Sequence, residues 1–246
     1  SYLQIAELLI PYLLEMGFTH VEFMPVMEHP YDASWGYQCT GYFSATSRFG
    51  SPVEFMKLID QLHQHEIGVI LDWVPSHFPG DEHGLFFLDG AHTYEYADMR
   101  KGYHPDWNSY IFNYKRGEVQ SFLISSAHFW FKYYHADAIR VDAVNSIIRL
   151  DYSRKDGHWE PNEFGTNENI EAVSFLKKMN SILYASFPDV QTIAEEATDW
   201  PMITKPIHEG GLGFGMKWMM GWMHDTFSFF KTTPSLRPYK QDVFTF

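Results

Sequence analysis

The sequence predicts an α/β fold in which parallel strands alternate with helices as an incomplete (β/α)8 barrel. Short apolar runs typical of buried strands recur along the 246 residues, and helical periodicity fills most of the intervals between them. Three of these runs end in carboxylates, at the strand ends where a parallel barrel carries its active site. The pattern therefore favours an enzyme, and an enzyme that acts on sugars fits it best.

The predicted elements follow one another in regular order. A helical stripe ends at Gly17, and a capping box at Ser51 begins a second helix that runs to about Glu66. Two more helices are predicted, at residues 119–134 and 167–183. Five strands are predicted, at residues 20–26, 68–74, 136–144, 190–196 and 218–225, although the methionines of the last run suit a helix as well.

One connection is much longer than the others. Residues 76–117 show no sustained periodicity, yet they contain ten Phe, Tyr and Trp residues. A long loop that follows the carboxyl end of a barrel strand is usually functional, so this segment is predicted to be an inserted active-site loop region. Most of its aromatic rings are expected to form a small satellite core. One or two are expected to stack on sugar rings, with Trp107 and Tyr103 as candidates at an acceptor site.

Composition narrows the possible partners and the setting. The net charge of −13 makes a nucleic-acid partner improbable on electrostatic grounds. The single Cys39 rules out an intramolecular disulfide, no apolar run is long enough to span a membrane, and the first residues do not resemble a signal peptide. A cytoplasmic location is therefore expected. The chain opens directly on a helix and closes in the apolar run Asp242–Phe246, so neither end is expected to be a domain boundary.

Polar side chains at the strand ends suggest glycosidic chemistry. Retaining cleavage requires a nucleophilic carboxylate and a second carboxyl that acts first as acid and then as base. Arg140 and Asp142 should point to the same face of a strand, so the arginine is expected to keep Asp142 ionised as the nucleophile. Glu195 follows an apolar run and suits a proton donor in a drier setting, whereas the side chain of Glu196 should face the opposite way.

Two other interpretations apply to these strand ends. An Arg-x-Asp pair alone is more often a structural ion pair, and only its combination with Asp72, His77 and Glu195 favours an active site. A divalent-metal hydrolase on the same barrel would typically carry a His-x-His pair on a strand. The spacing occurs only at His63–His65, within a predicted helix where the two side chains do not face one site.

Three segments resemble, in the right order, short conserved regions of the α-amylase superfamily: DWVPSH at 72–77, IRVDAV at 139–144 and IAEE at 193–196. The wider sequence resembles the bacterial 1,4-α-glucan (glycogen) branching enzymes still more closely, and this resemblance covers essentially the whole chain. It is carried by WGYQCTGY at 35–42, DYSRK at 151–155, WEPNEFG at 159–165, and segments between 211 and 225.

This resemblance implies a transglycosylase that cleaves α-1,4 links in glycogen or amylose and forms α-1,6 branches with retention. It implies Asp142 as nucleophile and Glu195 as general acid/base. The implied substrate-binding residues are Tyr37, Gln38, Asp72, His77 and Arg140. Tyr37 would stack beneath the sugar in the cleaved subsite, and His77 would contact that sugar. Arg140 would hold Asp142, and Asp72 would support the site structurally. No cofactor is implied, and Ser76 replaces the asparagine that helps bind calcium in many amylases, so no metal is expected.

The resemblance also implies that residues 1–246 are a partial catalytic domain, covering about strands 2 to 6 with the long loop after strand 3. The third catalytic aspartate of the family is expected beyond Phe246, because His224-Asp225 fits the sixth-strand segment instead. The rest of the barrel and flanking domains of the same protein are expected partners, without which the chain should be inactive. The alternatives are a hydrolytic α-amylase or debranching enzyme, and a non-catalytic glucan-binding protein on a decayed barrel.

Overall fold

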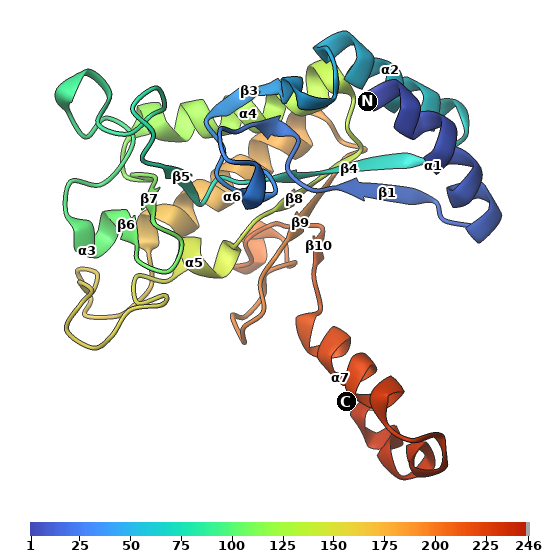
Figure 1. The fold of residues 1–246 in the computed structure, drawn as a ribbon. Helices are drawn as coiled ribbons and strands as arrows, with labels where there is room; N and C mark the ends of the chain where they lie inside the picture. Colours follow the sequence, from blue (N-terminus) through green and yellow to red (C-terminus); the bar gives the residue numbers. More distant parts are fainter. Residues whose placement is uncertain (245–246) are drawn as a thin grey trace.

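A computed structural model describes residues 1–244, so that the end of the expected apolar run, Thr245 and Phe246, lies outside the described residues. Its centre is a parallel sheet whose strands follow the chain order: β1 (His20–Phe23), β4 (Gly68–Trp73), β8 (Ala138–Val141), β9 (Gln191–Ala194) and β10 (Met216–Lys217). Sequential parallel neighbours are the topology of a (β/α)8 barrel, and the described part of the chain supplies five of its strands (Figure 1). The predicted fold class is confirmed.

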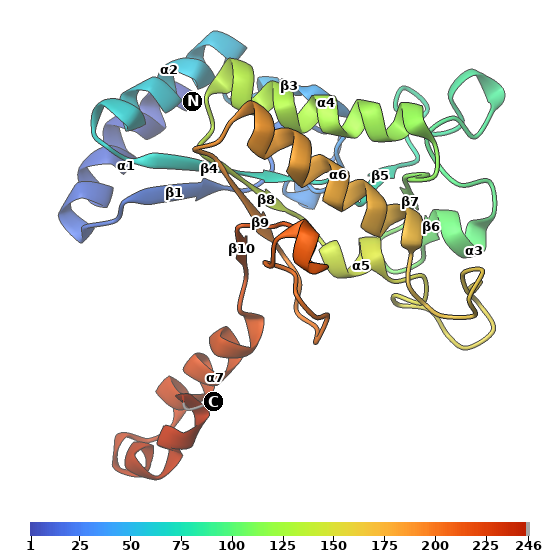
Figure 2. The ribbon, with the colours of Figure 1, turned by 180° about the vertical axis from the view of Figure 1, so that it is seen from behind.

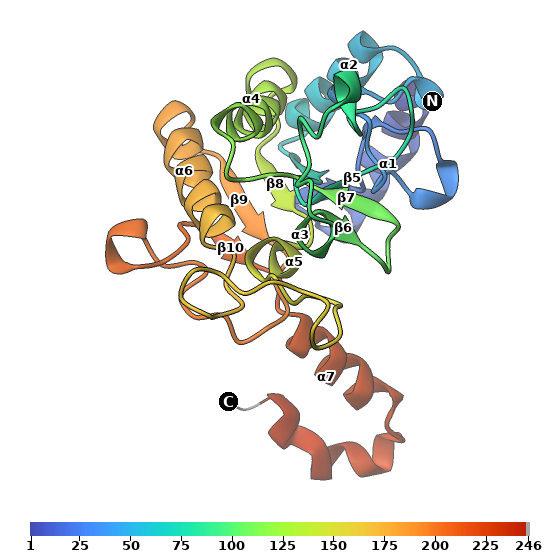
Figure 3. The same cartoon turned by 90° about the vertical axis from the view of Figure 1, so that its left-hand side faces the viewer.

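Helices connect most neighbouring strands and cover the outer face of the sheet. Helix α1 (Tyr2–Met16) precedes β1, α2 (Pro52–Gln64) leads into β4, α4 (Gly117–Tyr134) into β8 and α6 (Ile170–Ser186) into β9. They lie side by side in an arc around the strands (Figures 2 and 3). Both caps of the predicted kind are present, since Ser51 and Glu54 form the capping box of α2 and Gly17 ends α1 at a left-handed φ of 71°.

The remaining elements are shorter. A hairpin of β2 (Met27–Glu28) and β3 (Gly41–Ala45) follows β1, and α5 (Val144–Ile148) follows β8. Single 3-10 turns occupy η1 (Asp32–Ser34), η2 (Ser47–Phe49), η3 (Leu88–Gly90) and η4 (Ile207–Glu209). Helix α7 (Met220–Lys231) and the turns of η5 (Pro234–Phe244) form an arm that extends away from the sheet (Figure 1).

The fifth strand is not where the sequence predicted it. It pairs through Met216 and Lys217 with β9, and most of the predicted span of residues 218–225 instead lies in α7. The span contains no β-branched residue before Thr226, and its methionines are good helix formers, so local propensity favours the helix.

The long segment 76–117 contains a small sheet of its own. Strands β5 (His77–Pro79), β7 (Ser109–Ile111) and β6 (Tyr103–His104) pair antiparallel in that order, and α3 (Met99–Gly102) leads into β6. The strands are only two or three residues long, which is too short to produce a periodic pattern. Phe78, Phe112 and Tyr114 are buried, as expected for a satellite core.

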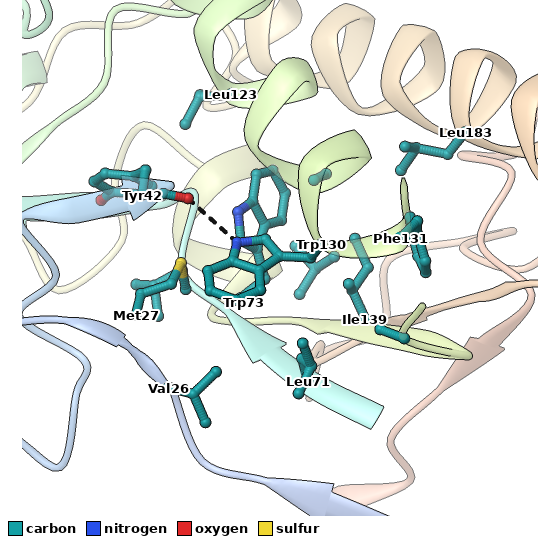
Figure 4. Close-up of a cluster of buried hydrophobic side chains, with 14 of the residues drawn as sticks. Val26, Met27, Tyr42, Leu71, Trp73, Leu123, Trp130, Phe131, Ile139 and Leu183 are labelled. Atoms are coloured by element: carbon teal, nitrogen blue, oxygen red, sulfur yellow. Dashed lines mark hydrogen bonds between the residues drawn. The ribbon is translucent and has the colours of Figure 1, made fainter. Parts of the chain in front are cut away.

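The main core lies between the sheet and its helices (Figure 4). Two buried indoles meet there, Trp73 from β4 and Trp130 from α4. Trp73 donates from Nε1 to Ser126 Oγ at 3.1 Å, and both Ser126 Oγ and Trp130 Nε1 donate to the carbonyl of Tyr42, at 2.8 and 3.2 Å. These bonds fix the β3 hairpin to α4 and leave neither indole N–H unsatisfied. No helix in residues 1–244 is both long and apolar enough to cross a membrane.

Candidate active site

A cavity of about 950 Å³ opens beside the carboxyl ends of β4, β8 and β9. The loop elements β5–β7, α3 and α5 all lie at this end of the sheet, on the left in Figure 1. Six of the seven residues selected from the sequence line this cavity: Tyr37, Gln38, His77, Arg140, Asp142 and Glu195. The seventh, Asp72, is buried and bonded to two of them.

Arg140 joins three carboxylates that come from three strands. Its Nη1 donates to Asp142 Oδ1 at 2.9 Å and to both oxygens of Asp72 at 2.7 Å, and its Nη2 lies 3.2 Å from Glu195 Oε2. Burial alone would lower the pKa of Arg140, but these three carboxylates outweigh it and raise that pKa. The guanidinium therefore stays charged and holds the acids at fixed positions.

Asp142 is not held in its ionised form by Arg140 alone. Its carboxyl is buried, and burial, with Asp72 and Glu195 adding negative charge nearby, raises its pKa from 3.8 to about 7 against the lowering effect of Arg140. One cation faces three acids here, so the site holds a surplus of negative charge. The expectation of an ionised Asp142 thus applies above neutral pH, where the carboxyl has lost its proton.

The two adjacent glutamates have different environments. Glu195 lines the cavity, keeps 27% of its side chain exposed, and accepts a hydrogen bond at 2.7 Å from the backbone N–H of Ala143. Glu196 points elsewhere, is fully buried, and lies 2.7 Å from Lys217 Nζ. The two side chains point in opposite directions, as predicted. The drier setting expected for Glu195 is not present, because Glu195 is the more exposed of the two residues and strand alternation directs Glu196 into the packed interior.

The remaining selected residues form the walls. The Tyr37 hydroxyl donates to Asp72 Oδ2 at 2.6 Å, and burial together with that carboxylate raises the pKa of the phenol. Gln38 donates from Nε2 to the carbonyl of Trp107 at 3.0 Å. Asp72 is thus bonded on one side to Tyr37 and on the other to Arg140, which is the supporting position expected of it.

His77 is a buried wall residue. Burial lowers its pKa to about 4, so the imidazole is neutral at pH 7. Its ring lies 5.0 Å from that of Trp107 and 6.1 Å from that of His104, measured between centroids. Trp107 lines the cavity as predicted, whereas Tyr103 is not among the described lining residues and instead bonds Asn108.

Several residues at the site were not selected from the sequence. Tyr152 and Asn145, which follow the Asp142 strand, line the cavity, and the Oδ1 of Asn145 has no hydrogen-bond partner within residues 1–244. The indole of Trp218 lies 4.3 Å from the Arg140 guanidinium carbon. Trp218 and Tyr152 both fall in segments that carry the family resemblance, but no strand-end pattern distinguishes them.

Two rejected candidates lie apart from the cavity. His224 and Asp225 are in α7, and neither belongs to the cavity wall. His63 pairs with Asp137 at 2.8 Å, on the helix as predicted. Within the described residues there is no group of three or more His, Cys, Asp or Glu side chains arranged to hold a metal ion.

Comparisons with known proteins show what this chain is similar to. A family model described as the alpha-amylase catalytic domain matches residues 5–108. The chain is 63% identical over its whole length to the 1,4-alpha-glucan branching enzyme GlgB of Aquifex aeolicus and 55% identical to that of Trichormus variabilis, of which it spans 39% and 32%. It thus covers about a third of the length of these relatives.

The solved structures share the fold at low sequence identity. An alpha-amylase from Geobacillus thermoleovorans, crystallised with acarbose, matches 92% of this chain and 46% of its own with a TM-score of 0.67 at 16% identity. A family GH13_31 enzyme matches 81% of this chain and 44% of its own with a TM-score of 0.60 at 21% identity. The chain is thus similar over its whole length to bacterial GlgB branching enzymes, and the two solved structures show that it shares the fold of an alpha-amylase.

Proposed function

We propose that the protein is a 1,4-α-glucan branching enzyme, with Asp142 as nucleophile and Glu195 as general acid/base. The observation that carries this proposal is the bridge of Arg140 to both carboxylates inside one cavity. One guanidinium holds these two carboxylates near each other, as a retaining mechanism requires, whereas an inverting pair stands further apart with a water between its carboxyls.

In the first half of the reaction, the ionised Asp142 attacks C1 of a glucose unit in an α-1,4-glucan. The C1–O4 bond breaks, and Glu195 gives its proton to the departing O4. In the second half, the 6-hydroxyl of another glucan attacks the same C1, Glu195 takes the hydroxyl proton, and Asp142 leaves as a carboxylate. Retention follows from the two displacements.

The other selected residues have supporting roles in this proposal. Tyr37, Gln38 and His77 bind the sugar, with the Tyr37 ring beneath it, while Asp72 fixes both Tyr37 and Arg140. Residues 1–246 act as part of the catalytic barrel domain, and the 76–117 segment contributes Trp107 to its active site. A cytoplasmic setting fits the single buried Cys39.

The test incubates the complete protein with amylose and measures α-1,6 linkages by proton NMR. The expected result is α-1,6 linkages with few new reducing ends, and their loss in Asp142→Asn. New reducing ends without α-1,6 linkages would instead identify a hydrolytic amylase. Full activity in the Asp142→Asn variant would show that Asp142 is not the nucleophile, and binding of amylose without any cleavage by the unmodified protein would support the non-catalytic alternative.

A further inference from the structure

Two aromatic rings from separate loops meet at the cavity wall. Trp107 belongs to the segment between β4 and β8, and Tyr152 to the loop after α5. Both are half-buried and line the cavity, and their ring centroids lie 5.4 Å apart at an interplanar angle of 47°. The contact joins the long loop to the loop that follows the nucleophile strand.

A third ring holds this pair in place. His104 is only 2% exposed, and its centroid lies 4.6 Å from that of Trp107 and 5.8 Å from that of Tyr152. Neither ring nitrogen has a hydrogen-bond partner within residues 1–244, and burial lowers the pKa of His104 to about 3, so the imidazole is neutral. The three rings touch pairwise, which makes the Trp107–Tyr152 surface preformed rather than assembled on binding.

The position of Tyr152 relative to the acids indicates which sugar this surface meets. The departing oxygen and the incoming 6-hydroxyl both exchange their proton with Glu195, so the acceptor sugar lies on the Glu195 side of C1. Tyr152 and Trp107 line the same cavity as Glu195. The Tyr37 ring is assigned to the sugar that is cleaved, so the Trp107–Tyr152 surface is an aromatic wall left for the second glucan.

We propose that Trp107 and Tyr152 form one acceptor platform, and that Tyr152 is a specificity-determining residue for transfer over hydrolysis. This inference rests on the proposed branching function and names the sugar that the platform receives, a glucan offering its 6-hydroxyl. Flat faces at the wall bind the apolar face of a pyranose and exclude water from C1. The sugar hydroxyl then displaces Asp142 and gives its proton to Glu195, where water would otherwise release a free reducing end.

The experiment compares the complete protein with Tyr152→Phe, Tyr152→Ala and Trp107→Ala on amylose, and counts α-1,6 linkages and new reducing ends separately. Tyr152→Ala is expected to lower the ratio of linkages to reducing ends about tenfold, the loss expected of one aromatic contact. The total rate of α-1,4 cleavage is measured in the same assay and should fall less than the rate of α-1,6 linkage formation, because attack by water does not use the platform. Tyr152→Phe should keep the ratio, since it keeps the ring.

Phe164→Ala is the matched control, because Phe164 is an aromatic residue of the same loop that is 75% exposed and lies outside the cavity wall. A Tyr152→Ala, Trp107→Ala double variant should show about the same ratio as the more affected single variant, because the two rings act as one surface. Trp107→Ala also tests the platform if the Tyr152→Ala protein does not fold.

Three outcomes would overturn the inference. An unchanged ratio in Tyr152→Ala or in a folded Trp107→Ala would remove the platform, and equal losses of cleavage and transfer would make the rings part of the donor site. Multiplying effects in the double variant would show two separate contacts. If the unmodified protein forms no α-1,6 linkages, the branching function itself fails, which is distinguishable from all three.

Discussion

The backbone N–H of Ala143 donates a hydrogen bond at 2.7 Å to the carboxylate of Glu195. A second bond, from the N–H of Val144 to the Glu195 carbonyl at 2.9 Å, joins the same two strand ends. The two residues directly after Asp142 therefore fix the side chain and the backbone of Glu195. The N–H reaches Glu195 because Ala143 adopts a left-handed conformation with φ of 52° before α5.

Ala143→Val is expected to reduce branching activity by about tenfold or more. A β-branched residue is strained at positive φ by about 1–3 kcal/mol, and relief of that strain turns the N–H away from Glu195. Ala143→Gly, which tolerates this conformation, should stay within about threefold of the unmodified enzyme. Steady-state assays on amylose would measure both, and equal activity of the two variants would contradict the role of this backbone geometry.

Replacing the two glutamates should separate catalysis from stability. Glu195→Gln removes the proposed proton donor and is expected to lower activity by about 10²–10⁴-fold with little change in melting temperature. Glu196→Gln leaves Lys217 without its buried counter-charge, so it should lower the free energy of unfolding by about 1–3 kcal/mol and largely spare catalysis at 25 °C. Activity assays and calorimetry on both variants measure these effects. A loss of activity in Glu196→Gln and a loss of stability in Glu195→Gln would contradict the assignment.

The acid side of the pH profile should reflect Asp142. Its pKa of about 7 lies above the ordinary value of 3.8, and only the ionised carboxylate can attack C1. The value of kcat/KM should therefore fall about tenfold per pH unit below pH 7. A profile that stays flat down to about pH 5 would show that Asp142 keeps an ordinary pKa in the complete protein.

Arg140→Gln should shift the fall of kcat/KM on the acid side of the pH profile to higher pH, because the change removes the positive charge that lowers the pKa of Asp142. Arg149→Gln is the matched control. Arg149 carries the same charge but pairs with the exposed Asp199 and lies outside the cavity wall. The pH dependence of kcat/KM is measured for both variants. If the acid side of the profile does not move in Arg140→Gln, the charge of Arg140 does not lower the pKa of Asp142.

Ser126→Ala should destabilise the barrel domain by about 1–3 kcal/mol. The change leaves the Trp73 indole N–H buried without its partner and removes one of two bonds to the Tyr42 carbonyl. Ser125→Ala, one residue earlier on the exposed side of α4, should change stability by less than about 0.5 kcal/mol. Thermal unfolding of both variants measures the difference.

The sequence predicts the parts of this fold in which the pattern is long. Helices α2, α4 and α6 and strands β1, β4, β8 and β9 lie within or close to their predicted spans. All of these except β1 bury a stripe or a run of residues, which is the pattern that predicts them. The two-residue strand β10 is too short for any period, and the adjacent methionines and aromatics match the start of α7 equally well. The strand is therefore set by its pairing with β9, which local sequence does not encode.

The site was predictable where chemistry is tied to strand ends. Asp72, Arg140, Asp142 and Glu195 come together because alternation and parallel strand order bring them to one edge. Tyr152 reaches the cavity from an irregular loop, and Trp218 reaches Arg140 from the end of β10, which is too short to show a period. The raised pKa of Asp142 also depends on burial beneath those loops, which strand-end spacing does not reveal.

The Arg140 guanidinium acts as a rigid spacer between three strands. It is planar, and its N–H groups diverge at fixed angles, so one side chain contacts Asp72, Asp142 and Glu195 together and constrains their separation. Exchanging loops around the cavity would then change which sugars reach the acids without changing the spacing of the acids themselves. A lysine at this position has a single ammonium group and could not preserve that spacing. An engineered protein of this kind should therefore keep the spacing of its acids when the loops are exchanged, but not when Arg140 is replaced by lysine.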